Sequence, residues 1–540
     1  MTSPGTYDAI IVGGGHNGLT CACYLAAGGL KVKVLERRSI VGGAAVTEEF
    51  HPGFRNSTAS YTVSLLNPKV IRDLRLAEHG LRILERPLSN FLPLPNGDMF
   101  TVSPDNNAFR REVARFSEAD AGRLNDFQDR ITRVADQIRA LLLETPPSPS
   151  GGVSDLWRAM RMGLDMRRLG QDGQRDLHEF FTRSAGAILD DWFESNPIKA
   201  LYGFDAVVGN YAGPYAEGSA YVLMHHAFGE VNGRRGVWGH AVGGMGSITQ
   251  AMAAEALRLG VDIETNASVA RVNTDADRAV GVSLDDGREF SARSVIANVN
   301  PKLLYLQLIE PGALDQEFLG RMRRYRCGSG TLRMNVALSE LPKFDCMSGT
   351  GPQPGHQSGI IIGPSLGYME QAWLDARTYG WSRSPVIEML IPSTLDDSLA
   401  PEGQHVASLF CQQFAPELPE GQNWDTARDA AVETVIDKVT EYAPNFRDSI
   451  LGMIALTPAN LEHEFGLVGG DIFHGALGLD QLFSARPMLG YGDYRGPLKG
   501  LYMCGSGTHP GGGVTGAPGH NAAREILKDF RRRKARHLPG

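Results

Sequence analysis

The sequence lacks several features that mark particular classes of protein. Over its 540 residues, no apolar run reaches the roughly 18 uncharged residues that a membrane-spanning helix needs. The formal net charge is −8, so no excess of basic residues indicates binding to nucleic acid. The N-terminus has no basic region followed by an apolar core, and the first predicted strand already begins at Tyr7, which leaves no room for a cleavable targeting segment. These absences predict a cytoplasmic protein.

Cysteine is also scarce, with six residues in the whole chain. Cys21 and Cys23 lie two positions apart on a predicted helix, so they face different directions and form neither a CxxC redox pair nor a metal-binding pair. The adjacent His225 and His226 likewise cannot share one helix face as a metal pair would. We therefore expect buried free thiols in a reducing compartment and no metal site. The remaining cysteines stand alone: Cys327, Cys346, Cys411 and Cys504.

The stretch from Tyr7 to Glu36 has the order of parts that a dinucleotide site needs. Residues 7–12 are a short apolar run typical of a buried strand, residues 19–30 can form a helix, and residues 32–35 return as a second strand. Glu36 stands at the end of that second strand, where it can accept hydrogen bonds from the hydroxyl groups of a ribose. Its negative charge also disfavours a 2′-phosphate.

The turn between the first strand and the helix reads Gly-Gly-Gly-His-Asn-Gly, which fits GxGxxG. Gly13 allows the tight turn, Gly15 lets the backbone approach a pyrophosphate, and Gly18 lets helix and strand pack closely. The helix start adds free N–H groups and a positive dipole end. A glycine-rich turn without a ligand is the disfavoured alternative, because strand, helix and acid all stand in place. No second GxGxxG has this context, so we expect that NAD(P)H is not a bound co-substrate.

A second glycine pair, Gly42-Gly43, follows the ribose acid, and a plain nicotinamide domain does not need it. The segments GGGHNGL and ERRSIVGGAAVTEEFHPGF together resemble the phytoene desaturase-like branch of the FAD-dependent amine oxidase superfamily. Residues 501–516, LYMCGSGTHPGGGVTG, resemble the C-terminal FAD motif of that family, and residues 469–475, GGDIFHG, match the same branch. Within the branch, the sequence is most similar to pyridine nucleotide-disulfide oxidoreductase domain protein 2 and the β-carotene ketolases.

The resemblance implies an α/β fold. Its core is a Rossmann-like FAD-binding domain of the two-domain flavoprotein type, with an inserted mixed-sheet substrate domain and a helical region. We expect residues 1–75, 236–303 and 461–540 to form a discontinuous FAD-binding domain. Residues 76–235 would form a helical, substrate-access region, and residues 304–460 would form the substrate-binding domain.

The resemblance also assigns FAD-binding roles to both glycine-rich ends of the chain. Val269 matches a strand that backs the adenine, and the helix after Thr515 would point its positive end at flavin N1 and O2. The expected cofactor-binding residues are Gly13, Gly14, Gly15, Asn17, Gly18, Glu36, Arg37, Gly42, Gly43, Ala44, Val269, Gly505, Ser506, Gly513, Val514 and Thr515.

The reaction that the resemblance implies is removal of a hydride from a C–H group to flavin N5, with loss of a proton from the neighbouring carbon. The expected substrate is a small hydrophobic molecule, isoprenoid, carotenoid-like or lipid, and electrons would pass to oxygen or a quinone. His474, with Asp471 three residues before it, is the first candidate for a base, and His509 in the C-terminal motif is the second. For each histidine, a role in satisfying backbone groups is the simpler interpretation.

Three alternatives share these motifs. The chain could be a ketolase-like flavoprotein that inserts oxygen, an amine oxidase-like flavoenzyme, or a non-catalytic FAD-binding partner protein, because cofactor motifs report binding rather than turnover.

Residues 157–168 combine Trp157, Met160 and Leu164 with four arginines. Such a segment can lie on an anionic membrane surface. A solvated helix face whose arginine stems cover apolar surface is the favoured interpretation. Before it, the Pro-, Ser- and Gly-rich residues 146–152 predict an exposed linker. The basic run 531–536 suits the negative dipole end of the last helix better than a membrane anchor.

Overall fold

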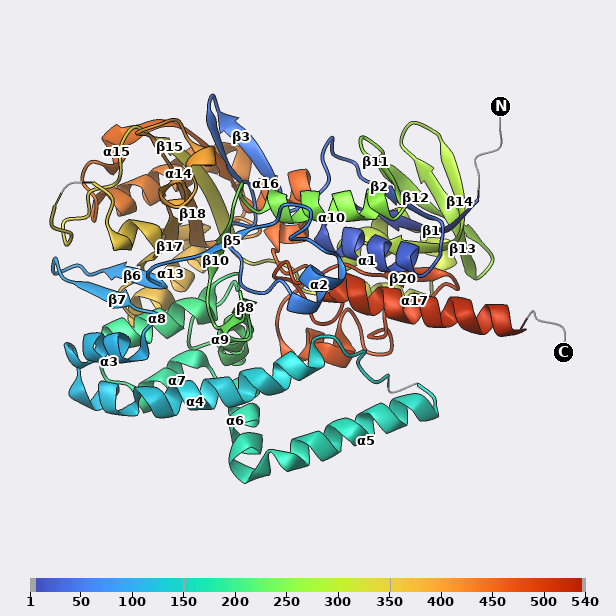
Figure 1. Ribbon diagram of the computed structural model, residues 1–540, viewed down its shortest axis with the longest axis horizontal. Coiled ribbons are helices and arrows are strands. Elements are labelled where there is room, and N and C mark those ends of the chain that lie inside the picture. The colour runs from blue at the N-terminus through green and yellow to red at the C-terminus, as the bar shows by residue number, and fades with distance from the viewer. Residues whose placement is uncertain (1–5, 149–150, 350, 537–540) are drawn as a thin grey trace.

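Two seven-stranded sheets organise the chain in the computed structural model, which describes residues 6–148, 151–349 and 351–536 (Figure 1). Residues 149 and 150 of the predicted linker lie outside this description. Together with a group of helices, the two sheets confirm the predicted α/β fold. In the described part of the chain, no helix is both long and apolar enough to cross a membrane.

The first sheet contains the predicted strand–helix–strand unit at its centre. Its order is β11-β2-β1-β14-β13-β12. The strand β20 pairs with the last residues of β14, on the side opposite β1 and beyond the part that pairs with β13. The pairs β11–β2, β2–β1, β1–β14 and β14–β20 are parallel, and β12, β13 and β14 form an antiparallel meander. The strands are β1 (Tyr7–Val12), β2 (Val32–Leu35), β11 (Asp262–Glu264), β12 (Val269–Asp275), β13 (Arg278–Leu284), β14 (Glu289–Ala297) and β20 (Leu501–Met503).

Three helices cover one face of this sheet: α1 (His16–Ala27), α10 (Gly246–Arg258) and α17 (Ala517–Arg536) (Figure 1). Their apolar residues share one buried cluster with β1 and β2. The helices α1 and α17 approach so closely that a Cβ on Gly519 would lie 2.2 Å from the carbonyl oxygen of Asn17. The two ends of the chain are therefore packed directly against each other.

The second sheet has the order β19-β15-β18-β17-β16-β6-β7. The helix α14 (Trp424–Thr440) packs on one face against Ile387 and Met389, and α13 (Leu366–Tyr379) packs on the other against Val386. The strands are β6 (Asn90–Pro93), β7 (Met99–Val102), β15 (Thr331–Leu338), β16 (Gly359–Ile362), β17 (Trp381–Leu390), β18 (His405–Phe414) and β19 (Ile450–Leu456).

One placement differs from the sequence prediction. The hairpin of β6 and β7 was expected in the helical region 76–235, whereas in the structure it extends the second sheet through the parallel pair of β6 with β16. Phe91 and Leu92 are both buried, because successive side chains of a strand point to opposite faces and both faces of this strand are covered. The hairpin itself, around Asn96-Gly97, was predicted correctly.

The helical region lies below the second sheet in Figure 1. Its longest helix, α4, begins after Ser117, whose Oγ accepts a hydrogen bond of 3.1 Å from the backbone N–H of Asp120. Apolar residues of α4 three and four positions apart are buried, as the sequence predicted. The helices are α3 (Asn106–Ala114), α4 (Glu118–Leu141), α5 (Val153–Arg168), α6 (Gly170–Thr182), α7 (Ala185–Trp192), α8 (Asn196–Val207) and α9 (Ser219–Ala227).

Shorter elements complete the chain. These are β3 (Thr47–His51), β4 (Phe54–Ser57), α2 (Pro68–Asp73), β5 (Ile83–Glu85), β8 (Glu230–Val231), β9 (Arg234–Arg235), β10 (Gly239–Ala241), α11 (Pro301–Leu303), α12 (Gln316–Arg323), α15 (Phe446–Ser449) and α16 (Pro458–Phe465).

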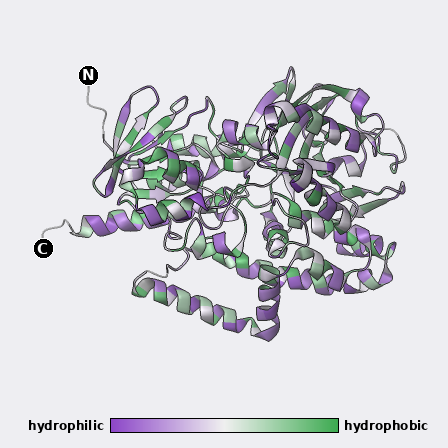
Figure 2. Cartoon of the chain, turned by 180° about the vertical axis from the view of Figure 1, so that it is seen from behind, coloured by the Kyte–Doolittle hydropathy of each residue, from purple (hydrophilic) through white to green (hydrophobic). Residues whose placement is uncertain are grey.

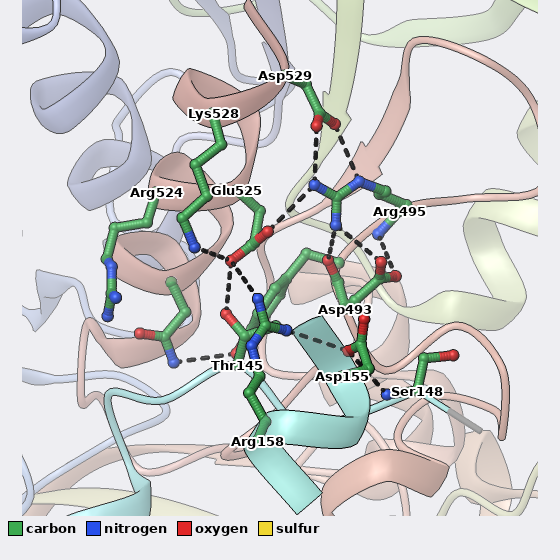
Figure 3. Close-up of polar contacts among 12 residues, drawn as sticks. Thr145, Ser148, Asp155, Arg158, Asp493, Arg495, Arg524, Glu525, Lys528 and Asp529 are labelled. Carbon is green, nitrogen blue, oxygen red and sulfur yellow. Dashed lines mark hydrogen bonds and ion pairs between the residues drawn. The ribbon is translucent and has the colours of Figure 1, made fainter. Parts of the chain in front are cut away.

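A polar network joins the start of α5 to α17 (Figure 3). Glu525 is at its centre: one oxygen accepts a hydrogen bond of 2.8 Å from Thr145 Oγ1, and the other lies 3.1 Å from Arg495 Nη2. Arg495 also contacts Asp529 at 2.9 Å, and Arg158 of α5 lies 4.0 Å from Glu525. Burial alone would raise the pKa of Glu525, but its contacts with Lys528, Thr145 and Arg495 lower that pKa to about 2, so the carboxylate is ionised at neutral pH. Through Arg158 the network reaches the first part of α5.

Candidate functional site

A cavity lies at the carboxyl ends of β1 and β2, next to the start of α1. Gly13 follows β1 with a φ of +98°, a backbone conformation that favours glycine, and its N–H donates to the carbonyl oxygen of Leu35 at 2.8 Å. The cavity is lined by residues of the first glycine motif, of β2 and β12, and of the loop after α16. This is the edge of a parallel sheet where such folds bind nucleotides.

Glu36 is held at this edge by the backbone. One carboxylate oxygen accepts from the N–H of Gly14 at 2.7 Å, and the other accepts from the N–H of Arg38 at 2.9 Å. The side chain lines the cavity although only 6% of the residue is exposed. A carboxylate fixed in this way is preorganised to accept hydrogen bonds from a ribose.

Asn298, directly after β14, joins the two glycine-rich ends. Its Nδ2 donates to the carbonyl oxygen of Gly13 at 3.1 Å. A Cβ on Gly15 would lie 3.0 Å from this amide, one on Gly18 would lie 2.8 Å from it, and one on Gly505 would lie 3.2 Å from Asn298 Oδ1. Since side chains at these three positions would collide with Asn298, the glycines allow both motifs to meet there.

Residues 13–18 and 505–516 are in direct contact. Asn17 Nδ2 donates to Ser506 Oγ at 3.1 Å. Near the end of the C-terminal motif, Thr515 Oγ1 accepts a hydrogen bond of 3.1 Å from the N–H of Ala517, at the start of α17. Both glycine-rich segments therefore border one cavity.

The sixteen predicted cofactor residues fall into three groups. Eight line the cavity, and two line an adjoining chamber. The others support these: Gly14 bonds to Glu36, Asn17 bonds to Ser506, and the remaining residues allow close packing or cap a helix. The cavity group is Gly13, Gly15, Glu36, Arg37, Gly43, Ala44, Val269 and Ser506, the chamber group is Gly513 and Val514, and the supporting group is Gly14, Asn17, Gly18, Gly42, Gly505 and Thr515.

The polar atoms of the cavity fit a flavin nucleotide. His16 Nε2, Arg38 Nη1 and His474 Nδ1 are buried without a hydrogen-bond partner among the described residues, and all three side chains line the cavity. Asn17 Oδ1, beside Ser506, is in the same state. Buried polar atoms without partners are rare in folded proteins, so a ligand with several acceptors and donors is expected here. The glycines let a ligand approach the backbone, and the unpaired polar atoms can bond to it, which together suit a dinucleotide.

Comparison with known proteins decides the family. A family model described as flavin containing amine oxidoreductase matches residues 18–331. The chain belongs to this family. FAD is therefore the cofactor of this flavin-containing amine oxidoreductase, and the enzyme is an oxidoreductase.

Individual relatives agree with this result. Pyridine nucleotide-disulfide oxidoreductase domain-containing protein 2 of Rattus norvegicus is 38% identical over 97% of this chain and 94% of its own length. The lycopene-forming phytoene desaturase of a Paracoccus strain is 25% identical over 98% of this chain and 99% of its own. A solved oxidoreductase from Methanosarcina mazei has the same fold, with a TM-score of 0.62 at 17% identity over 96% of this chain and 99% of that one.

A chamber adjoins the cofactor cavity of the oxidoreductase. The two share His16, Ala44, Leu467, His474 and Ser506 in their walls. The chamber wall is largely apolar, with Leu65, Val208, Trp238, Phe410, Ile472, Phe473 and Val514. A substrate in this chamber would therefore lie directly beside the flavin.

Among the three predicted catalytic residues, His474 alone lines these spaces. The carboxylate of Asp471 accepts from the N–H groups of Gly328, Phe473 and Gly475 at 2.8, 2.8 and 3.1 Å, so it holds the loop on which His474 stands. His509 faces away from both spaces, because its Nε2 lies 2.9 Å from the carbonyl oxygen of Leu141. Asp471 and His509 therefore lie outside the walls of both spaces, and a catalytic role for either residue stays a prediction from the sequence.

Four histidines line the chamber; His225 and His226 are buried, and His16 and His474 are partly buried. Loss of contact with water disfavours the charged form of each ring. Burial lowers the pKa of His474 and His225 to about 3, and the pKa of His16 and His226 to about 4. At neutral pH these rings are uncharged donors and acceptors of hydrogen bonds.

Tyr61 is a chamber residue that the sequence did not single out. Its hydroxyl donates to Glu388 Oε2 at 2.5 Å, and the guanidinium of Arg333 lies 4.7 Å from the centre of its ring. Arg86 donates to Thr62 Oγ1, next to Tyr61. These groups come from β15, β17 and two loops, so only the folded chain brings them together. A tyrosine in the hydroxyl-rich segment after β4 was the one signal in the sequence.

The Gly15→Val substitution tests the cofactor cavity. A valine would project into the cavity and bring its Cβ to 3.0 Å from Asn298 Nδ2. We expect the FAD content of the purified protein to fall at least about tenfold, as loss of a single good contact already produces. Absorbance near 450 nm relative to protein measures this content. The control is Gly122→Val in α4, where a Cβ meets no atom within 4 Å. An undiminished FAD content in Gly15→Val would contradict the assignment.

Proposed function

We propose that the enzyme dehydrogenates a small hydrophobic molecule, of isoprenoid, carotenoid-like or lipid type, with electrons passing on to oxygen or a quinone. One observation carries this proposal: a mostly apolar chamber shares a wall with the cofactor cavity. When bound, FAD supplies a two-electron acceptor that takes a hydride at N5. The similarity to a phytoene desaturase supports the substrate class.

The chain's own residues would position and protect the substrate. Phe410, Phe473 and Trp238 give the chamber large apolar surfaces that exclude water. His474 stands where cavity and chamber meet, and its unpaired Nδ1 can accept a proton from the carbon next to the one that loses the hydride. Asp471 would keep His474 in place through the loop that its carboxylate holds.

Anaerobic bleaching of the flavin by a panel of isoprenoids, lipids and amines tests the proposed function. We expect bleaching by an isoprenoid or lipid, because these fit an apolar chamber. In the same experiment, stopped-flow mixing with NADPH should give no fast bleaching, since the chain carries a single dinucleotide motif with its full context. Bleaching by amines alone would replace the proposal with an amine oxidase, and fast bleaching by NADPH would contradict the expected electron path.

The substitution His474→Ala tests the proton acceptor. We expect flavin reduction by substrate to slow by at least about 100-fold, the usual contribution of a positioned base, while FAD content changes little. With a pKa of about 3, the imidazole is in its accepting form from pH 5 upward, so the wild-type rate should show no step near the ordinary histidine pKa of 6.5. His356→Ala, which removes a buried histidine from the short helix just before β16, is the control. An unchanged rate in His474→Ala would remove it from the mechanism.

We also propose a cytoplasmic protein that contacts membranes peripherally through α5, from which a lipophilic substrate can arrive. The favoured sequence interpretation was a face on which arginine stems cover the apolar residues. In the structure Val153, Leu156 and Trp157 are instead 72%, 65% and 65% exposed. The helix lies at the edge of the molecule, away from both sheets, and carries apolar and polar residues along its length (Figures 1 and 2). Arg161 and Arg167 beside the apolar residues suit an anionic surface.

Flotation with lipid vesicles tests this contact. The FAD-loaded protein should float with vesicles that contain phosphatidylglycerol, and less with pure phosphatidylcholine, because arginines contribute part of the binding energy. Trp157→Asp should abolish flotation, since a charge would enter the apolar stripe. The matched control is Leu257→Asp on α10, where the wild-type residue is 59% exposed. If Trp157→Asp floats as the wild type does, α5 is not the contact.

A further inference from the structure

The chamber contains more unpaired polar atoms than a purely apolar substrate would need. Among the described residues, nine buried side-chain nitrogen or oxygen atoms have no hydrogen-bond partner. Five of the nine belong to residues that line the chamber: His16, Ser60, Ser64, His225 and His474. Leaving such an atom without a partner destabilises a protein, because the atom gives up its hydrogen bond to water on burial. Their concentration in one small space therefore indicates a polar group of a ligand.

These five atoms divide between two ligands. His16 also lines the cofactor cavity, where FAD can satisfy it, and His474 lies where cavity and chamber meet, with its Nδ1 assigned to the substrate proton. Ser60, Ser64 and His225 line the chamber alone. We call these three residues the polar subsite. Their unpaired atoms are two hydroxyl oxygens and the Nδ1 of a neutral imidazole, so together they can both donate and accept hydrogen bonds.

His225 is held in place by its surroundings. Its ring lies 5.0 Å from the ring of Phe473 and 5.1 Å from that of Phe228, both in edge-to-face arrangements. Because these contacts hold the imidazole in place, its buried Nδ1 is available to a ligand in the chamber. Through Phe473 the polar subsite is thus connected to the loop of His474, which borders the cofactor cavity.

The charge around the chamber excludes a cationic group. Among the described residues that line the chamber there is no aspartate or glutamate. Behind Tyr61 and Thr62 lie two buried arginines, Arg86 and Arg333, and one carboxylate, Glu388. Two buried positive charges against one negative charge give this wall a positive potential, which an ammonium group would meet without a partner.

We propose that the polar subsite binds an oxygen function, a hydroxyl, carbonyl or carboxyl group, on an otherwise apolar substrate. The inference rests on the proposed function for the position of the chamber beside the flavin, and it narrows the substrate class. Pure hydrocarbons leave Ser60, Ser64 and His225 unpaired, and amines meet the positive wall. An oxygenated isoprenoid or lipid satisfies the three atoms and keeps its apolar body against Leu65, Phe410 and Ile472.

The experiment compares four molecules of similar carbon skeleton: geraniol, geranic acid, geranylamine and the hydrocarbon myrcene. Each is titrated anaerobically into the FAD-loaded protein, and the shift of the flavin absorption bands gives its dissociation constant. We expect geraniol or geranic acid to bind at least about tenfold more tightly than myrcene and geranylamine. Equal affinities across the series, tightest binding of geranylamine, or no binding of any of the four would overturn the proposal, because water alone would then satisfy the three atoms.

Variants locate the preference in the polar subsite. Ser64→Ala and His225→Phe should each weaken binding of the preferred oxygenated ligand by about tenfold and leave the affinity for myrcene unchanged. Ser294→Ala is the matched control, because Ser294 Oγ is also buried and unpaired but lies in β14, outside the chamber. FAD content is measured for each variant, so a loss of cofactor is not mistaken for a loss of ligand. Unaltered selectivity in both variants would overturn the assignment.

The same titration separates this inference from the proposed function. Selective binding of an oxygenated ligand without bleaching would support the polar subsite and contradict dehydrogenation of that ligand. Bleaching by all four molecules with equal affinities would support dehydrogenation and contradict the polar subsite.

Discussion

The contact between the two ends of the chain is the constraint on which the site depends. Asn17 and Ser506 are 489 positions apart, and the hydrogen bond between them closes the cofactor cavity. The two glycine motifs follow β1 and β20, and both strands pair in parallel with β14, one on each side. This pairing brings the two motifs to the same edge of the sheet. Asn298, at the end of β14, stands between the two glycine motifs. A Cβ at Gly18 would lie 2.3 Å from the carbonyl oxygen of Gly13, and a Cβ at Gly15 or Gly505 would make a tight contact with Asn298.

The second sheet sets the shape of the chamber through a few buried hydrogen bonds. Asn335 of β15 accepts from Asn56 Nδ2 and donates to the carbonyl oxygen of Ser57, both at 2.9 Å. Arg333, two residues earlier on the same strand, donates to the carbonyl oxygen of Ala59 at 2.8 Å. The segment that follows carries the chamber residues from Ser60 to Leu65. Because buried polar groups destabilise a fold when they lose a partner, these bonds fix the segment firmly.

Sequence patterns predicted the parts of the molecule that depend on local order. The strand, turn and helix from Tyr7 to Ala27 follow directly from an apolar run and spaced glycines, and α4 follows from its 3.6-residue period. Periodicity also located the apolar stripe of α5, yet it does not say which side of a helix faces the core. In the structure the stripe containing Leu156 and Trp157 faces outward. Arg158 of α5 lies 4.0 Å from Glu525 of α17, a contact between distant parts of the sequence that no local pattern reveals.

The candidate site was predictable only where its residues are neighbours in sequence. The glycines at positions 13, 14, 15 and 18 and Glu36 belong to one strand–turn–helix–strand unit, so their spacing in the sequence predicts that they lie close together. Asn298, Tyr61 and His225 come from separate elements, and their roles arise from contacts made after folding. His509 shows the reverse case: it lies in a motif that borders the cofactor cavity, but the turn of the backbone directs its ring to Leu141.

Charge distribution links the fold to the chemistry of the chamber. A chamber that excludes water cannot hold ionised side chains without partners, and the histidines around it meet this condition by staying neutral. Arg333 holds the segment before Ser60 at the carbonyl oxygen of Ala59, and Arg86 donates to Thr62 Oγ1 just after it. Glu388, which accepts from the Tyr61 hydroxyl, lies on the same side of the wall. The field of the two arginines still reaches the chamber, because little solvent lies between to screen it. The bonds that position the chamber wall therefore also bias the chamber against cations, so that structural and recognition roles rest on the same two arginines.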